Sequence, residues 1–313
     1  MERQVKNFKI KETFDINDVP DNLTTKGYSE TSDFVPPIDQ SYVFRKDLLS
    51  DILAWHTFGS STEGFYMTGP TGSGKTTLPM QVSARLNIPI VSINAHSRLE
   101  TPELVGQYSL VKGEMKFIDG PLTMALRKGY WFLLNEIDLL DPATAAGLNE
   151  IAEGRPLVIP ENDSEIVHPA EGFAFLVTGN TAGGGDDKGV YQGTIRQNMA
   201  FIDRFWMTYV DYPDEELELN IIQKAVPNLS EDILKTMVSF AGNIRSLFMD
   251  EELDVTMSTR TLIRWARMTD FFRPLKNKGV NPIYHALDRA LCFRTSKDGQ
   301  ASIHEVAQRL FGI

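Results

Sequence analysis

Residues 69–76 read GPTGSGKT and match the pattern G-x-x-x-x-G-K-[S/T] in full. An apolar run, GFYMTG, leads into this stretch, and a helix-compatible segment follows it through Leu86. Glycines at these spacings let successive backbone N–H groups point inward around phosphate oxygens. The helix N-terminus behind the loop adds a favourable field for an anion. The chain is therefore constrained to an α/β fold built on a strand, a phosphate-binding loop and a helix.

The loop predicts a site for ATP and Mg²⁺. The Lys75 ammonium would reach the β- and γ-phosphates, and the Thr76 hydroxyl would bind the metal. The predicted nucleotide-binding positions are Gly69, Pro70, Thr71, Gly72, Ser73, Gly74, Lys75, Thr76 and Thr77. A glycine-rich turn without a ligand is the alternative, but the flanking strand and helix favour the nucleotide site.

Further apolar runs alternate with helical segments up to Tyr212. The runs predict strands within 88–95, 130–136, 173–180 and 204–212, in addition to 64–69. Strands that are almost wholly apolar suit a parallel sheet covered on both faces. Two hairpins are predicted in addition, at 109–120 with a turn at Lys112–Glu114, and at 156–169.

Changes in composition predict three parts of the chain. Residues 1–45 are polar and turn-rich, and they are expected to form an extended arm with one short strand near 5–10. Residues 46–212 carry the alternating strands and helices. Residues 213–313 are helical throughout, which predicts a separate helical lid domain.

Polar residues at the strand ends are the candidates for chemistry. Glu136 follows the run YWFLLN and is the candidate base that polarises an attacking water. Asn180 ends the fourth predicted strand, and its amide would orient that water. The alternatives are a solvated glutamate and a turn asparagine. Asn135 stands where nucleotide hydrolases usually carry an aspartate, and it would hold Mg²⁺ through a water molecule.

Two arginines complete the candidate set. Arg204, in the stretch IDRF, would act as an arginine finger across a subunit interface. Arg260 lies in the predicted first turn of a lid helix, with Ser258 as its cap, and would reach the γ-phosphate of its own subunit. The alternative for each is a surface ion pair, which is the commoner role of a single arginine.

Composition argues against several other classes of protein. The net charge of −11 argues against nonspecific binding to nucleic acid or to an anionic membrane. A single cysteine, Cys292, permits no intrachain disulfide, which fits a reducing cytoplasm. The N-terminus lacks the apolar core of a signal peptide, and no run is long enough to span a bilayer. The five histidines are scattered and show no metal-ligand spacing; they are His56, His96, His168, His285 and His304.

These motifs, in this order, resemble those of the AAA+ ATPases. The two hairpins, one interrupting the second helix and one before the strand that ends in Asn180, narrow the resemblance to the MoxR-like branch. Within that branch the chain is similar to the CobS-type ATPase subunits of aerobic cobaltochelatases. The similarity covers roughly residues 35–313 and is carried by stretches such as FLVTGNTAGGGDDKGVYQGTIRQNMAFIDRF and MSTRTLIRWA.

The resemblance implies a P-loop AAA+ core with a five-stranded parallel sheet in the order 5-1-4-3-2, two hairpin inserts and a C-terminal helical lid. It also implies a homo-oligomeric ring, usually hexameric, that works with a partner carrying a von Willebrand factor A domain. In the chelatases, a large subunit then inserts Co²⁺ into a corrin ring. Asn135 departs from the family pattern, which has aspartate there.

Two classes of function follow from the sequence. The first is an ATPase motor that remodels or activates a partner, either of the cobaltochelatase type or as a MoxR-type activator of another metalloenzyme. The second is a nucleotide-gated scaffold with little or no hydrolysis. Asn135 is the feature that favours the scaffold, whereas the rest of the candidate set favours the motor.

Overall fold

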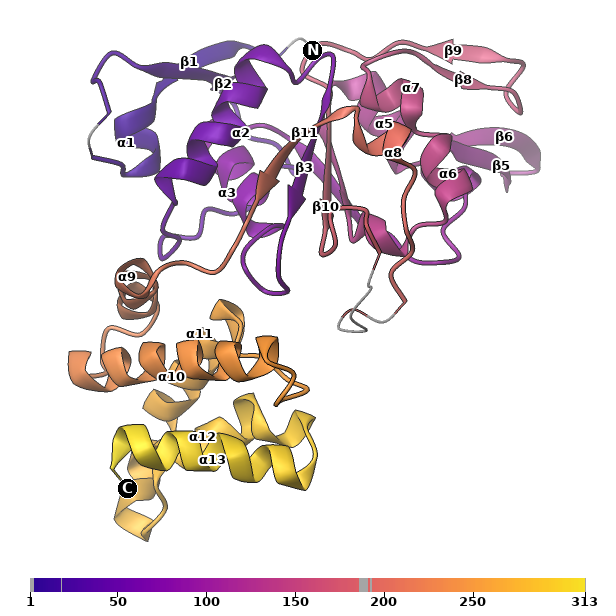
Figure 1. The fold of residues 1–313 in the computed structure, drawn as a ribbon. Helices are drawn as coiled ribbons and strands as arrows, with labels where there is room; N and C mark the ends of the chain where they lie inside the picture. Colours follow the sequence, from indigo (N-terminus) through magenta and orange to yellow (C-terminus); the bar gives the residue numbers. More distant parts are fainter. Residues whose placement is uncertain (1–2, 18, 186–190, 192, 313) are drawn as a thin grey trace. The chain divides into compact units, whose positions relative to one another are not determined.

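The computed structural model describes residues 3–17, 19–185, 191 and 193–312. The chain divides into two units, which are described separately (Figure 1). The first unit comprises residues 1–39, 44–69 and 75–210, and the second comprises residues 40–43, 70–74 and 211–313.

A parallel sheet of five strands forms the centre of the first unit. Its order is β11-β3-β10-β7-β4, which confirms the predicted order 5-1-4-3-2. Each predicted strand is present, with these bounds: β3 Gly64–Thr68, β4 Ile90–Asn94, β7 Trp131–Asn135, β10 Ala174–Gly179 and β11 Phe205–Tyr209. Because the strands are parallel, all five carboxyl ends lie at one edge of the sheet.

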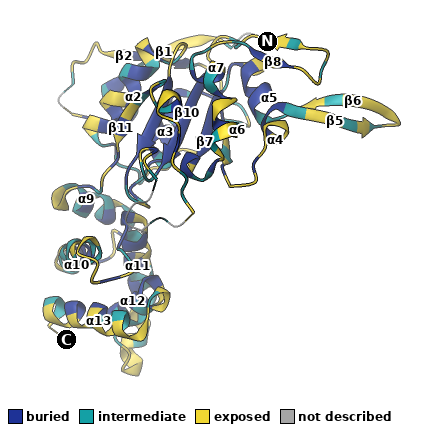
Figure 2. Cartoon of the chain, turned by 45° about the vertical axis from the view of Figure 1, so that its right-hand side comes forward, coloured by how far each residue is buried: buried dark blue, intermediate teal, exposed yellow. Residues whose placement is uncertain are grey.

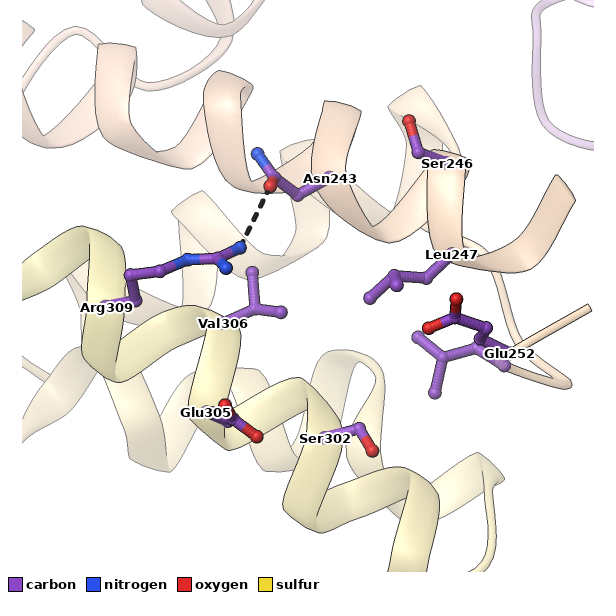
Figure 3. Close-up of a pocket in the computed structure, with 9 residues that line it drawn as sticks. Asn243, Ser246, Leu247, Glu252, Ser302, Glu305, Val306 and Arg309 are labelled. Carbon is purple, nitrogen blue, oxygen red and sulfur yellow. Dashed lines mark hydrogen bonds between the residues drawn. The ribbon is translucent and has the colours of Figure 1, made fainter. Parts of the chain in front are cut away.

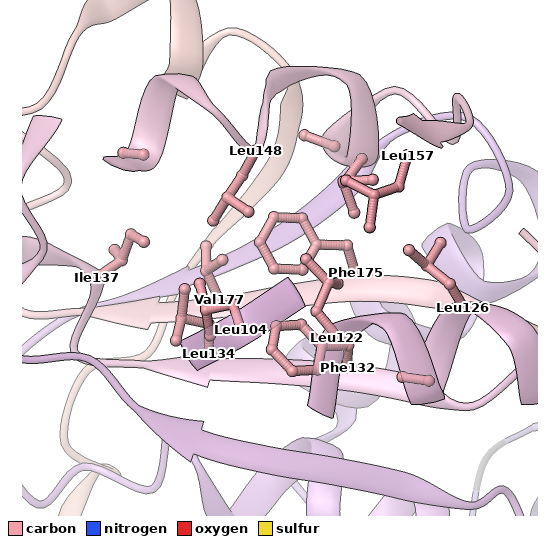
Figure 4. Packing of buried hydrophobic residues seen from close by; sticks show 14 of the residues in the cluster. Leu104, Leu122, Leu126, Phe132, Leu134, Ile137, Leu148, Leu157, Phe175 and Val177 are labelled. Carbon is pink, nitrogen blue, oxygen red and sulfur yellow. The ribbon is translucent and has the colours of Figure 1, made fainter. Parts of the chain in front are cut away.

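Helices and hairpins surround this sheet. Their bounds are α2 Lys46–Phe58, α3 Thr77–Leu86, α4 Thr101–Val105, β5 Gly106–Val111, β6 Glu114–Asp119, α5 Pro121–Lys128, η1 Ile137–Leu139, α6 Pro142–Ala146, α7 Asn149–Ala152, β8 Leu157–Ile159, β9 Glu165–Val167 and α8 Met199–Ile202. On one face of the sheet, Phe132 and Phe175 pack among leucines of the covering elements (Figure 4). The Trp131 ring is turned to the other face, where Trp55 of α2 lies 5.7 Å from it between ring centroids. Both faces are covered, which explains why the strands are apolar throughout.

The N-terminal residues of the first unit form more structure than the single strand predicted near residues 5–10. Strand β1 (Val5–Lys9) is present and pairs antiparallel with β2 (Thr24–Tyr28), and α1 (Ile10–Phe14) lies between them. The Phe14 ring is buried and meets Phe44 edge to face at 5.0 Å between ring centroids. Sequence reasoning missed α1 and β2 because tertiary packing, and not local periodicity, stabilises such short elements.

Both predicted hairpins are confirmed. In the first, Lys112 and Gly113 both have positive φ, as a two-residue type I′ turn requires. Strand β5 begins at Gly106, earlier than predicted, so α4 is a single turn. Figure 2 shows this hairpin projecting from the first unit with mostly exposed residues. Leu110 and Met115 pair across it and are 71% and 63% exposed.

The second unit is helical and has its own core. Its elements are α9 Glu215–Ala225, α10 Glu231–Met249, α11 Thr259–Phe271, η2 Arg273–Lys278, α12 Pro282–Ala290, η3 Cys292–Arg294 and α13 Lys297–Phe311. A buried ion pair joins α9 to α10, because Glu218 accepts from Arg245 at 2.7 and 2.8 Å. The Thr259 hydroxyl of α11 donates to the same carboxylate at 2.6 Å. None of the helices in the described parts of the chain has both the length and the apolar character that a membrane crossing requires.

Candidate nucleotide site

The backbone of the GPTGSGKT loop fits a phosphate-binding role. Gly69, Gly72 and Gly74 have φ values of +141°, +69° and +106°. At Gly69 a side chain is also excluded by space, because a Cβ atom would lie 2.3 Å from the Val210 carbonyl oxygen. The Ser73 hydroxyl is buried and has no hydrogen-bond partner among the described residues. A buried polar group of this kind is the type that a bound phosphate would satisfy.

Lys75 links the loop to the end of strand β10. Its ammonium is nearly buried and donates to the Gly69 carbonyl at 2.7 Å and to Asn180 Oδ1 at 2.8 Å. Strands β3 and β10 are neighbours in the sheet, so the loop after one and the asparagine after the other meet at the carboxyl edge. The structure thus brings together two residues that are 105 positions apart in the chain.

Asn135, at the end of the next strand, has a fully satisfied side chain. Its Oδ1 accepts from the Thr76 hydroxyl at 2.8 Å and from the Thr178 hydroxyl at 3.2 Å. Its Nδ2 donates to Ser92 Oγ at 2.8 Å and to the Ile93 carbonyl at 3.3 Å. An aspartate could accept the first two bonds but could not donate the last two. The asparagine is therefore matched to its surroundings.

Two effects are expected of an Asn135→Asp substitution. The added charge should strengthen Mg²⁺ retention by about 1–2 kcal/mol, or roughly 5- to 30-fold in half-saturating Mg²⁺, with a similar maximal ATPase rate. The carboxylate would also face the Ile93 carbonyl, so the free energy of unfolding should fall by about 1 kcal/mol. Mg²⁺ titration of ATPase activity and urea unfolding measure the two effects. A wild-type protein that is inert at every Mg²⁺ concentration beside an active Asn135→Asp variant would contradict this expectation.

Glu136 turns the chain at the end of β7. Its backbone is left-handed, with φ of 57° and ψ of 44°, and its side chain is exposed. Its N–H donates to the Thr178 hydroxyl at 3.2 Å. A left-handed glutamate costs about 1 kcal/mol or more, and such strain is found most often at functional sites. The turn keeps the carboxylate outside the core at the carboxyl edge of the sheet.

The sequence suggests Asp138 only as an unlikely substitute for the aspartate absent at position 135, and its positioning role was not predicted. Asp138 is only 1% exposed. Its carboxylate accepts hydrogen bonds from the Tyr66 hydroxyl at 2.9 Å, from the Thr181 N–H at 3.0 Å and from the Asn180 N–H. Burial, and then the nearby Asp138 charge, raise the pKa of Tyr66, so the phenol remains a donor. Asp138 thus fixes the backbone that carries Asn180, and it is not available to replace Asn135. An acidic residue inside the apolar run EIDLL was the signal in the sequence.

Arg204 lies at the other edge of the sheet. It precedes β11, whose first residue Phe205 pairs with Gly64 at the start of β3. Its guanidinium contacts the Glu153 carboxylate at 2.7 Å and the Ala200 carbonyl. The length of β3, about 13 Å, separates this edge from the phosphate loop of the same chain.

Arg260 belongs to the second unit. It is exposed in the first turn of α11, and Ser258 caps this helix as predicted by accepting from the Thr261 N–H at 3.2 Å.

A 5-1-4-3-2 parallel sheet with a phosphate loop at its carboxyl edge, in a chain that ends in a helical unit, defines an ATPase with an AAA-type domain. Comparison with known families supports the same assignment to an AAA-type ATPase. Residues 64–205 match the AAA domain of the dynein-related subfamily, and residues 218–310 match the CbbQ/NirQ/NorQ C-terminal domain. The chain belongs to the MoxR-like family of AAA+ ATPases, of the type represented by CbbQ, NorQ and CobS.

Individual relatives are similar over most of their length. The aerobic cobaltochelatase subunit CobS of Sinorhizobium sp is 28% identical over 313 residues, which cover 97% of this chain and 90% of CobS. The protein NorQ of Paracoccus denitrificans is 26% identical over 249 residues, which cover 79% of this chain and 86% of NorQ. An uncharacterized protein of Staphylococcus saprophyticus is 30% identical over 204 residues, covering 63% and 74%.

Proposed function

We propose that this ATPase hydrolyses ATP with Mg²⁺ in a homo-oligomeric ring, and that it uses the reaction to remodel or activate a partner protein. The observation that carries the proposal is the convergence of Lys75, Thr76, Asn135 and Asn180 at one edge of the sheet. In this proposal the loop amides and Lys75 hold the phosphates, Glu136 polarises the attacking water, and Asn180 orients it. Arg260 contacts the γ-phosphate from the lid.

The residues present fit a magnesium ion. The Thr76 hydroxyl donates its hydrogen to Asn135 Oδ1, which leaves the oxygen lone pairs for another partner. Thr76 would then hold Mg²⁺ directly and Asn135 would hold it through water. The ion supplies charge that neutralises the phosphates. Asn135 orients the threonine without a charge of its own.

The position of Arg204 supports the proposal of a homo-oligomeric ring. A residue at the edge opposite the phosphate loop can serve a neighbouring subunit, as the hexameric arrangement of the family requires. We further propose three parts of the chain: an arm at 1–45, an ATPase domain at 46–212 and a lid at 213–313. We also propose that the protein is cytoplasmic and has no specific nucleic-acid ligand.

The partner we propose carries a von Willebrand factor A domain, and a large chelatase subunit would complete a cobaltochelatase. Similarity to CobS across nearly the whole chain supports the chelatase role. The second candidate is activation of another metalloenzyme, by a member of the family that also includes NorQ.

Steady-state ATPase measurements on the wild-type protein and Glu136→Gln test the proposal. Loss of the base should lower the rate by about 10²–10⁴-fold while ATP binding persists. Glu161→Gln, a change at an exposed glutamate of the second hairpin, should keep the wild-type rate. A wild-type ring that binds ATP but shows no more turnover than Glu136→Gln would establish the scaffold function instead.

The hairpin of β5 and β6 is the proposed contact for the partner. Its exposed Leu110–Met115 pair adds an apolar surface to the polar turn. Replacing residues 111–116 with a short Gly-Ser turn should spare the fold and the basal ATPase rate but weaken stimulation by the partner. The same replacement at residues 160–164 of the second hairpin is the control. Loss of the folded state by circular dichroism in the first variant would show that the hairpin is structural.

A further inference from the structure

Three potential metal ligands meet in the second unit, among residues that the nucleotide site does not use. Asp288 lies on α12, Cys292 begins η3, and His304 lies on α13, which packs against α12 (Figure 1). One ligand atom from each side chain lies within 4.8 Å of the other two. His304 Nε2 is 2.6 Å from Asp288 Oδ1. The sequence predicted no such cluster, because His304 is distant from the other two residues and helix packing brings it near.

Cysteine, histidine and aspartate together can also form a nucleophilic triad, but the environment of Cys292 argues against one. The thiol is fully buried, so a substrate larger than a single ion has no access to it. Burial, with a contribution from Asp288, raises the pKa of Cys292 to about 12, which is the opposite of an activated thiol.

We propose that Asp288, Cys292 and His304 bind one zinc-type divalent transition-metal ion, with water as the fourth ligand. Sulfur, imidazole nitrogen and carboxylate oxygen are the three ligand atoms that zinc takes in proteins, at about 2.0–2.3 Å. Ligands around such an ion are about 3.3–3.8 Å apart. His304 Nε2 and Asp288 Oδ1, which lie 2.6 Å apart, would therefore separate on binding, whereas ligand atoms up to 4.8 Å apart would move closer. Mg²⁺ and Ca²⁺ prefer oxygen ligands alone, and the cysteine therefore selects against them.

The cluster is also accessible on one side. The side chains of His304 and Asp288 are 41% and 30% exposed, so an ion can arrive from solvent and a water molecule can complete its coordination. Another pocket of about 290 Å³ borders α13 where the helix faces α10 (Figure 3). Glu252 and Glu305 line it, but it offers oxygen and nitrogen groups without sulfur and does not compete for a thiol-seeking ion.

A bound ion would join α12, η3 and α13. Because the ion binds the folded state, the stability of the helical unit would depend on the free metal concentration. The site is independent of the proposed ATPase cycle, since none of its ligands belongs to the nucleotide set.

Calorimetric titration of the nucleotide-free, full-length protein with ZnCl₂ tests the proposal. The wild-type protein should bind one equivalent, and melting of the helical unit should shift upward with Zn²⁺. His304→Gln should weaken binding by about 100-fold or more. His285→Gln is the matched control, because His285 also lies in this unit but packs against Phe272 outside the cluster. It should bind as the wild type does.

CoCl₂ provides a second measurement that does not depend on stability. The wild-type complex should show a thiolate-to-cobalt charge-transfer band, and Cys292→Ser should lose it. If Cys292→Ser does not fold, Asp288→Asn serves instead, with weakened Zn²⁺ and Co²⁺ binding as its expected result. Equal Zn²⁺ affinity in wild type and His304→Gln, or no saturable binding in the wild type, would overturn the proposal.

Discussion

The Lys75→Ala protein is expected to bind ATP about 10²–10⁴-fold more weakly than the wild type. The ammonium is the one charged group of the GPTGSGKT loop, and it would donate to both the β- and γ-phosphates. Each charge-assisted bond is worth about 1.5–3 kcal/mol, so two of them account for about 3–6 kcal/mol of binding. The fold should survive, because the Gly69 carbonyl and Asn180 Oδ1 lose only one partner each.

Calorimetric titration with ATP measures this effect, and circular dichroism checks the fold. Lys26→Ala is a suitable control, because Lys26 is an exposed lysine of the same unit on strand β2. Its affinity should equal that of the wild type. An unchanged ATP affinity in Lys75→Ala would exclude the loop as the nucleotide site and would remove the basis of the proposed function.

The sheet could be predicted because its signals are local and strong. Five apolar runs, the glycine loop and the turn residues each define one element without reference to the others. The strand order was not local information; it came from the resemblance to a known family, and the structure confirms it. The turn of the first hairpin was also predicted, at Lys112–Glu114, and the structure adds its type I′ form, in which Lys112 and Gly113 have positive φ.

What could not be predicted depends on contacts between distant residues. The buried Asp138 carboxylate is satisfied by groups on β3 and beyond β10, so its burial makes sense only in the folded sheet. The saturation of Asn135 likewise needs Ser92 and Thr178 from the two neighbouring strands. Asp288, Cys292 and His304 come together only because α12 packs on α13. Residue spacing along the chain carries none of this information.

Arg204→Ala is expected to leave ATP binding nearly unchanged and to lower hydrolysis by up to about 10³-fold, as for other arginine fingers. The guanidinium is held near Glu153 at the sheet edge opposite the phosphate loop of its own chain. A role confined to the Glu153 ion pair would give a different result, because Glu153→Ala would then cause the same loss. Arg155→Ala is the control, since Arg155 contacts Glu153 at 2.7 Å and its side chain is 59% exposed. We expect Glu153→Ala and Arg155→Ala to hydrolyse ATP at close to the wild-type rate.

Mixing two inactive variants tests whether the Arg204 guanidinium acts on a neighbouring subunit. An Arg204→Ala subunit keeps Glu136 but contributes no finger, whereas a Glu136→Gln subunit keeps the finger but lacks the base. In a ring of exchanging subunits mixed in equal amounts, roughly a quarter of the interfaces would pair an intact Glu136 with an intact Arg204. ATPase activity should therefore rise from near zero toward about a quarter of the wild-type rate. If both residues acted within one chain, no subunit in the mixture would carry both, and activity would stay at the level of the separate variants at every ratio. Fluorescence transfer between labelled chains checks that the subunits exchange between rings. If they exchange and activity is still not rescued, a site shared between subunits is excluded.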